Sequence, residues 1–373
     1  GMDFTYSEEQ RMLADSLRRF VTSEYSFEKR RRNAREQGSF DRSIWSSLAE
    51  MGVLGLGVSA EHGGFSHGPA SQVVVQRELG RALMQEPVIP SGVIVATIFT
   101  QHATTAQQAE WLPTIAHGDK IFTLAYLEPD SRYRLEATRT VAQKCNADGY
   151  VLNGRKSAVW HGAVADMFLV SAKLDGALAL FLAGRDAPGL KVMGYPTIER
   201  LSGADLELID VPAILVTTNG LEAVELGLDH GMAAQCAAAA GAIERLVEIT
   251  VEYLSTRKQF GKPLASFQTL QHRVADMLLQ QELALSMAYV AAQGLGSTNV
   301  AERCRKVSAA KVITAKAARF VGQQAVQLHG GMGMTDEHEV GDYFKALTMV
   351  DVLLGDTDFH LERYGEGSWD GRQ

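Results

Sequence analysis

The chain has 373 residues, of which 46% are hydrophobic and 21% are charged; this is enough for two or three domains with a sizeable core. A net charge of −8 and a pI of about 5.7 argue against a general nucleic-acid binder but leave room for a local phosphate pocket. Three widely spaced cysteines, Cys145, Cys236 and Cys304, argue against a disulfide framework or a metal site, and no apolar run reaches the roughly 18 residues of a membrane helix. We therefore expect a cytoplasmic protein with no membrane or nucleic-acid partner.

Residues 1–118 are predicted to form an all-α domain. The stretch SEEQRMLADSLRRFV, residues 7–21, starts with Ser7 as a helix cap, and the two glutamates that follow suit the first turn of a helix. Apolar residues then recur at helical spacing. Further helices are expected at residues 42–52, 71–84 and 105–118.

Residues 119–221 are predicted to form a compact β-domain, because short β-like runs alternate with turn residues. Asn153 and Gly154 both tolerate positive φ, so this pair predicts a hairpin turn between YVL and RKSAVW. The expected strands lie in KIFTLAYL, TRTVAQK, YVLNG, DMFLVSAKL, ALALFLAG, DLELIDV and AILV.

Residues 222–373 are predicted to form a four-helix bundle, because the helical period returns in longer segments with short connections. The predicted fold class is therefore α+β: an N-terminal helical domain, a middle β-barrel-like domain and a C-terminal helix bundle. The expected bundle helices are residues 221–260, 266–294, 299–330 and 340–355.

The stretch TRKQFGKPLASFQTLQHRVADM, residues 256–277, joins the first two bundle helices and is rich in residues that bind planar or anionic groups. Arg257 lies where the C-terminal end of a helix attracts a cation. Taken alone, Arg257 is also explained as a capping residue, Phe260 fits a core position better, and Gln268 fits a solvated surface better.

A second stretch, QLHGGMGMTDEH at residues 327–338, ends the third bundle helix at Gly330 and Gly331. Two glycines at a helix end are either a simple C-cap or a place where a ligand approaches bare backbone. Because both stretches are expected on adjacent bundle helices, together they favour a ligand site.

These two stretches resemble the C-terminal motifs of the acyl-CoA dehydrogenase family, and LAEMGVLGLGVSAEHGGFS followed by RELGRAL resembles the family's first helical domain. The resemblance covers essentially the whole chain. Within the family, the chain is most similar to the small subunit of pimeloyl-CoA-type dehydrogenases, which pair with a larger homologous subunit. The resemblance implies non-covalent FAD, an acyl-CoA substrate, an electron-transferring flavoprotein as partner and a homo- or heterotetramer.

In the family, the arginine of TRKQFG and the QLHGG loop reach the adenosine and pyrophosphate end of an FAD that the neighbouring subunit mainly holds. We call this end the FAD tail. The chemistry agrees, since a guanidinium group donates paired hydrogen bonds to a diphosphate. The residues that the resemblance assigns to the tail are Arg257, Gln259, Phe260, Gln268, Gln327, Gly330 and Gly331.

The implied reaction is α,β-dehydrogenation of a thioester, in which a carboxylate removes the α-proton while the β-hydride moves to flavin N5. The usual position of that glutamate holds Leu354, and the position used by some members holds Gly231. Asp356 lies near the first position and is either a shifted base or, in the reading we favour, a helix-end carboxylate. Asp229 and His230 lie beside the second position, so the catalytic residue stays unassigned.

The two implied flavin loops of the β-domain also depart from the family. Leu127 replaces the threonine that precedes Glu-Pro in the first loop. In the second loop, Ala158 stands at a tryptophan position, Trp160 at a threonine position and His161 at an asparagine position. Trp160 is either a displaced flavin-stacking ring or a buried aromatic side chain.

Three readings follow. The chain is the small subunit that completes the FAD site of a larger catalytic sibling, a self-sufficient homo-oligomeric dehydrogenase with a displaced base, or a non-catalytic relative that binds acyl-CoA or FAD. Because the tail motifs are intact while the positions for the ring and base are altered, we favour the first reading slightly over the second.

Overall fold

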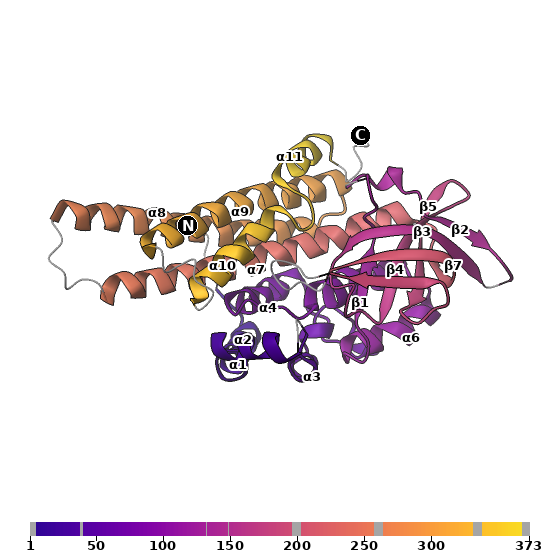
Figure 1. Ribbon diagram of the computed structural model, residues 1–373, viewed down its shortest axis with the longest axis horizontal. Helices are drawn as coiled ribbons and strands as arrows, with labels where there is room; N and C mark the ends of the chain where they lie inside the picture. Colours follow the sequence, from indigo (N-terminus) through magenta and orange to yellow (C-terminus); the bar gives the residue numbers. More distant parts are fainter. Residues whose placement is uncertain are drawn as a thin grey trace. The chain divides into compact units, whose positions relative to one another are not determined.

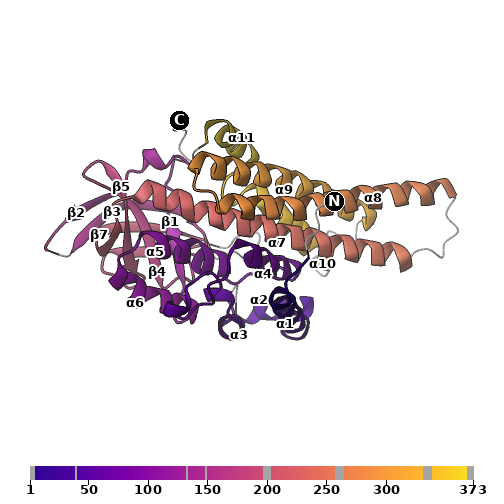
Figure 2. The same cartoon turned by 180° about the vertical axis from the view of Figure 1, so that it is seen from behind.

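The computed structural model of the chain describes residues 5–37, 40–131, 133–147, 149–195, 203–256, 264–330 and 338–367. Figure 1 shows its ribbon, and Figure 2 shows the same ribbon from behind. These residues divide into two compact units. The helical unit contains residues 5–30, 73–84 and 232–365, and the barrel unit contains residues 31–72, 85–231 and 366–367.

The N-terminal region is helical, as predicted. The Ser7 hydroxyl accepts a hydrogen bond from the backbone N–H of Gln10, whose side chain accepts one from the N–H of Ser7, so a capping box starts the first helix. The sequence reading missed the strongly polar second helix, because it has no apolar period. The helices are α1 (Glu8–Glu24), α2 (Phe27–Gln37), α3 (Arg42–Glu50), α4 (Pro69–Arg81), a π-helical turn (Val88–Val95), α5 (Ala96–His102) and α6 (Thr105–Ala116).

The middle of the chain forms a closed β-sheet, the predicted barrel. Its strands are hydrogen-bonded in the order β1-β4-β2-β3-β7-β5, and β5 also pairs with β4, which closes the sheet. Phe122, Phe168 and Phe181 are fully buried in the barrel unit. The strands are β1 (Phe122–Ala125), β2 (Val141–Lys144), β3 (Tyr150–Val159), β4 (Met167–Leu174), β5 (Ala177–Gly184), β6 (Leu190–Gly194) and β7 (Ala204–Thr217).

The predicted hairpin turn at Asn153-Gly154 is wrong, because β3 runs straight through both residues. Gly154 lies at a bulge in the pairing of β3 with β7, and a Cβ at this position would lie 2.4 Å from the Thr140 hydroxyl oxygen. The Asn153 amide exchanges two hydrogen bonds with Asp210, each 2.9 Å long. The glycine therefore permits a close approach inside a strand, which is its other common use.

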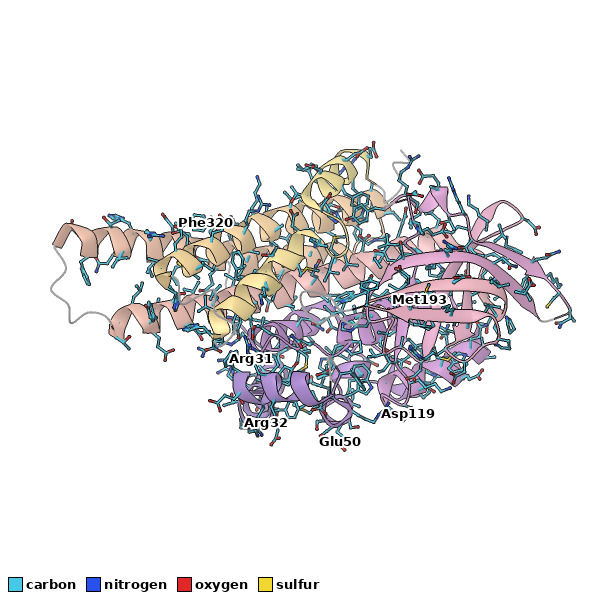
Figure 3. The ribbon with its side chains drawn as sticks, in the orientation of Figure 1. Arg31, Arg32, Glu50, Asp119, Met193 and Phe320 are labelled. Atoms are coloured by element: carbon cyan, nitrogen blue, oxygen red, sulfur yellow. The ribbon has the colours of Figure 1, made fainter. Side chains whose placement is uncertain are left out.

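Long helices form most of the C-terminal region, in agreement with the prediction. They are α7 (Gly220–Thr256), α8 (Leu264–Leu295) and α9 (Val300–Leu328). In the views of Figures 1 and 2, α8 and α9 run side by side. Alanines and branched aliphatic residues form the core of the helical unit, and Phe320 of α9, labelled in Figure 3, packs against that core from its partly buried position.

The fourth predicted helix, residues 340–355, is shorter than expected. Helix α10 (Glu339–Thr348) ends in a 3-10 turn at Met349–Asp351, and a separate helix, α11 (Thr357–Glu366), follows. Leu354 and Gly355 both have positive φ, at 62° and 99°, so the backbone cannot continue as a right-handed helix there. The segment between α10 and α11, residues 349–356, is called the base loop below.

Within the described ranges, no helix combines the length and apolarity needed to cross a bilayer. The domain boundaries at residues 118/119 and 221/222 stay predictions.

Candidate functional site

The structure describes three of the seven residues assigned to the FAD tail. Gln268 is exposed near the start of α8, Gln327 is exposed in the last turn of α9, and Gly330 is exposed just beyond that helix. All three belong to the helical unit. The other four, Arg257, Gln259, Phe260 and Gly331, lie outside the described residues.

Gly330 offers bare backbone, as the sequence reading expected. Its φ is +61°, a conformation that glycine adopts without strain, and a Cβ added there would meet no atom within 4 Å. The preceding residue, His329, caps α9 with its backbone N–H on the carbonyls of Ala325 and Gln327. The chain therefore leaves α9 through an exposed glycine whose backbone no neighbouring atom crowds.

Arg273 of α8 also belongs to this corner, and the sequence reading did not single it out. Its Nε donates a hydrogen bond to the Gln324 side-chain oxygen at 2.8 Å, and one Nη donates to the Gln327 side-chain oxygen at 2.9 Å. Both acceptors lie on one face of α9, three residues apart. The only sequence signal was the position of Arg273 inside the quoted 256–277 stretch.

The two positions expected to hold the catalytic base contain no ionisable group. Leu354 is 6% exposed in the base loop, and Gly231 is buried within α7. Gly355 is required where it stands, because an added Cβ would lie 2.6 Å from the Phe359 ring. The loop has therefore kept a glycine-dependent turn, while the side chain before it cannot accept a proton.

Two buried basic side chains hold the carbonyl groups of the base loop. The Lys311 ammonium group of α9 donates to the carbonyls of Val350 and Leu353 and to the amide oxygen of Gln235. His360 places Nε2 2.8 Å from the Leu354 carbonyl, which can only accept, so this nitrogen carries the proton. The loop around Leu354 is consequently fixed from two sides.

These basic groups titrate abnormally because they are buried. Burial lowers the pKa of Lys311 to about 7, although Cys236, Asp351 and Asp356 act in the opposite direction. Burial, Lys311 and Arg363 together lower the pKa of His360 well below its ordinary value. His360 is therefore neutral near pH 7, and it accepts a hydrogen bond from the Ser308 hydroxyl at 2.9 Å through Nδ1.

Asp356 starts α11. Its side-chain oxygen accepts a hydrogen bond of 2.9 Å from the backbone N–H of Phe359, three residues later. Its carbonyl accepts the backbone N–H of His360 at 3.1 Å. This is the geometry of a helix N-cap, so the helix-end reading accounts for the residue. A role for Asp356 as the base stays a prediction.

A buried ion pair links Glu128, in the first implied flavin loop, to Lys156 of β3, just before the second. The Lys156 ammonium group lies 2.7 Å from the Glu128 carboxylate and donates to the Ser171 hydroxyl at 2.8 Å. The Thr140 hydroxyl donates to the same carboxylate at 2.7 Å. Burial lowers the pKa of Lys156 to about 8 despite the neighbouring carboxylate. Burial alone would raise the pKa of Glu128, but Lys156 and the hydrogen bonds outweigh it and lower that pKa.

The positions that depart from the family pattern lie next to this ion pair in the sequence. They are Leu127, Ala158, Trp160 and His161. The Leu127 carbonyl accepts the N–H of Ser157 at 2.9 Å, but its side chain offers no hydrogen bond. Ala158 and His161 have positive φ, at 49° and 58°. The Trp160 and His161 rings stack with centroids 5.5 Å apart.

Two buried polar atoms in this second loop, Trp160 Nε1 and His161 Nδ1, have no hydrogen-bond partner among the described residues. Burial lowers the pKa of His161 to about 3, so the imidazole is neutral. The loop that departs most from the family thus holds two unsatisfied groups that face no water, an arrangement that costs free energy unless a ligand satisfies them.

Known proteins match this chain over nearly its full length. Sequence models of the acyl-CoA dehydrogenase N-terminal, middle and C-terminal domains match residues 7–119, 123–208 and 218–368, respectively. The chain is 30% identical to the acyl-CoA dehydrogenase FadE27 of Mycobacterium tuberculosis, over 98% of each chain.

Two solved structures are similar over nearly their full length. The ChsE4-ChsE5 complex from Mycobacterium tuberculosis matches with a TM-score of 0.86 and 28% identity over 98% of both chains. A variant of the Tcur3481-Tcur3483 steroid ACAD matches with a TM-score of 0.87 and 28% identity, over 96% of this chain and 97% of that one.

The Gln327 side chain at the end of α9, Arg273 of α8 beside it, and the open backbone at Gly330 suit a flavin dinucleotide, whose diphosphate and adenine accept hydrogen bonds. Together with the matches to all three domain models, they identify this chain as a member of the acyl-CoA dehydrogenase family of FAD-dependent oxidoreductases.

Proposed function

We propose that this chain is the small subunit of a heteromeric acyl-CoA dehydrogenase and completes the FAD site of a larger homologous subunit. The observation that carries this proposal is Leu354. It lies buried at the position expected for the catalytic glutamate, in a loop that Lys311 and His360 still hold in place. A chain that keeps the frame of the loop but lacks a proton acceptor is suited to support chemistry on a neighbouring subunit.

The two halves of the inherited site differ in a way that supports this division of labour. Gln268, Gln327 and Gly330 keep their identities and are exposed, so they are accessible to a neighbour. The side chain of Leu127, by contrast, cannot form a hydrogen bond with a flavin ring. The two similar structures are both named as pairs of chains, ChsE4-ChsE5 and Tcur3481-Tcur3483, and we extend that arrangement to this chain.

In the proposed assembly, FAD supplies the hydride acceptor for α,β-dehydrogenation of an acyl-CoA thioester. This chain contributes hydrogen-bond donors from Gln268 and Gln327 and bare backbone at Gly330 to the adenosine and diphosphate end. Removal of the α-proton falls to a glutamate of the larger subunit. An electron-transferring flavoprotein would be the electron acceptor of the complex.

The class of acyl group and the compartment are part of the same proposal. One similar structure is named a steroid ACAD, and the pimeloyl-type resemblance also points to a bulky acyl group, so we propose a bulky acyl-CoA as the substrate. The three cysteines, all within the described residues, form no disulfide, which fits a cytoplasmic location.

The test is to purify the chain alone and together with a larger homologue that has glutamate at the position of Leu354. We would measure FAD per chain from the visible spectrum and turnover of a panel of acyl-CoAs with an artificial electron acceptor. Little FAD and no turnover for the chain alone, with both restored in the co-purified complex, supports the proposal. One FAD per chain and turnover without a partner would refute it.

The Arg257→Ala variant tests separately whether this chain binds the FAD tail. Because a guanidinium group binds diphosphate through charge and paired hydrogen bonds, Arg257→Ala is expected to lower the FAD content of the purified complex. Unchanged FAD content in that variant would show that the motif does not bind the tail.

A self-sufficient homo-oligomer is the second candidate, and one observation favours it. Trp160 Nε1 and His161 Nδ1 are buried and have no partner in the part of the chain that the structure describes, and a flavin ring bound by the chain itself would satisfy such groups. Under this reading, Trp160→Phe removes one donor to the ring and shifts the visible spectrum of FAD bound to the chain alone. A chain without bound FAD would exclude this candidate.

A further inference from the structure

The arginines of the helical unit differ in what neutralises them. Arg18, Arg30, Arg77, Arg81 and Arg319 each lie within 4 Å of a carboxylate oxygen. Arg273 differs from these five: within the described residues, its guanidinium group contacts two neutral amide oxygens and no carboxylate. Because amides are neutral, they do not cancel the positive charge of this half-buried guanidinium group, which can still attract an external anion.

The same two hydrogen bonds fix the direction of the glutamine side chains. Arg273 engages the oxygen atoms of Gln324 and Gln327. The amide nitrogen of each glutamine is the other end of the same planar group, so it is turned away from the guanidinium group. Gln327 is exposed, which leaves its two N–H donors available at the surface.

The groups that this cluster offers to a ligand are mainly hydrogen-bond donors and a positive charge. Arg273 has unused N–H donors on its second Nη, since only Nε and one Nη are engaged. Each glutamine oxygen accepts one hydrogen bond from Arg273. An added Cβ at Gly330, three residues after Gln327, would meet no atom within 4 Å, so the backbone is open there. A cation with several outward donors favours an anionic, acceptor-rich group such as a diphosphate.

We propose that Arg273 is a positioning and anion-binding residue of the FAD-tail site. It orients the amides of Gln324 and Gln327, and its unneutralised charge attracts the diphosphate of an FAD held by the neighbouring subunit. The inference rests on the proposed function and adds Arg273 and Gln324 to the residues that sequence motifs assign to the tail.

The experiment measures the affinity of the apo complex, meaning this chain with its larger partner, for added FAD at several salt concentrations. Arg273→Met removes the charge and both hydrogen bonds but keeps much of the side-chain volume. It is expected to weaken FAD binding about tenfold and to flatten the salt dependence of Kd, because an electrostatic contact is screened by salt. Arg273→Lys keeps the charge and loses the planar fork, so the salt dependence should persist with an intermediate Kd.

Arg305→Met is the control, since Arg305 is an exposed arginine in the first half of α9, far along the chain from Gln327. It should leave Kd and its salt dependence unchanged. An effect of Arg273→Met on the melting temperature of the apo complex, with no effect on Kd, would show a purely structural cross-helix contact and overturn the inference. If Arg273→Met does not fold, an Arg273→Lys complex with wild-type Kd overturns it equally.

Arg257→Ala separates this inference from the proposed function. If Arg257→Ala loses FAD while Arg273→Met keeps wild-type affinity, the tail site exists and Arg273 is not part of it. If neither variant changes the affinity for FAD, the proposed tail role itself fails.

Discussion

At the scale of single residues, Leu354 lies in a firmly held loop at the position where the family resemblance places the catalytic glutamate. Gly355 still permits the tight turn, and Lys311 and His360 still occupy the loop carbonyls. Leu354 itself is 6% exposed and its side chain cannot accept a proton. The sequence predicts the absence of a proton acceptor at this position, and the structure adds that the loop around it is held by hydrogen bonds.

Asp356 gives a first prediction at this scale. Because its carboxylate caps α11 through the N–H of Phe359, Asp356→Ala should lower the free energy of unfolding by about 1 kcal/mol, and Asp356→Asn should change it much less. Urea unfolding of both variants measures this. Neither should alter the turnover of the complex beyond its loss of stability. A complex that contains a stable Asp356→Asn chain but has lost turnover would instead identify Asp356 as the base.

Lys311 gives a prediction about pH. Its pKa is about 7 in the folded chain, against an ordinary value of 10.5. Between these values the unfolded chain binds a proton that the folded chain has released, so the free energy of unfolding rises with pH across this window. Relative to Lys311→Met, which has no titrating group there, the wild type should gain on the order of 1 kcal/mol per pH unit. A difference between the two proteins that does not change with pH would show that Lys311 stays charged.

At the scale of elements, two glycines allow α4 and α7 to cross at close range within the helical unit. A Cβ at Gly80 would lie 1.9 Å from the Ala238 carbonyl oxygen, and a Cβ at Gly241 would lie 2.0 Å from the Arg77 carbonyl oxygen. Both clashes are with backbone, which cannot move aside as a side chain would.

We therefore expect Gly80→Ala to destabilise the chain by about 1–3 kcal/mol or more. Gly365→Ala on α11 is the control, because nothing lies within 4 Å of its Cβ position, and alanine in an exposed helix is expected to stabilise by about 0.5–1 kcal/mol. Denaturant midpoints of the two variants should move in opposite directions. Equal midpoints would mean that the helices separate at little cost.

The sequence was a good guide to long periodic elements and a poor guide to local exceptions. Helices α7, α8 and α9 follow from unbroken apolar periods. Asn153-Gly154 misled because the same dipeptide serves turns and strand bulges, and only the contact with Thr140 distinguishes them. Helix α2 was missed because its polar sequence shows no period.

At the scale of the whole molecule, the domain order and the family follow from motifs spread along the chain, whereas the contacts within the site do not. Gln327 was recognised by its place in QLHGG. Arg273 was not, because it lies 54 positions from Gln327 in the sequence, and no local pattern encodes such a pair. The orphaned atoms of Trp160 and His161 likewise became visible only once burial was known.

Assembly is the last property that belongs to this scale. Helix α8 carries Gln268, which we propose binds the FAD tail, and it presents large apolar side chains to solvent: Phe267 is 38% exposed, Leu278 47%, Leu279 62% and Leu283 39%. Several large apolar side chains exposed on one helix often mark a surface that a partner covers. Since the proposed function places a homologous subunit beside Gln268, we expect that subunit to cover this face.

Leu279→Asp should then dissociate the complex, because it removes about 1.5–3 kcal/mol of apolar burial and buries a charge in the contact. Light scattering at matched protein concentration should show smaller particles, and the bound FAD should be lost with the partner. Met12→Asp on α1 is the matched control, because Met12 is equally exposed at 64% and lies on the face of α1 opposite its buried residues. A Leu279→Asp chain that assembles and retains FAD like the Met12→Asp chain would place the neighbouring subunit on a different face and remove the main structural reason for assigning Gln268 to its flavin.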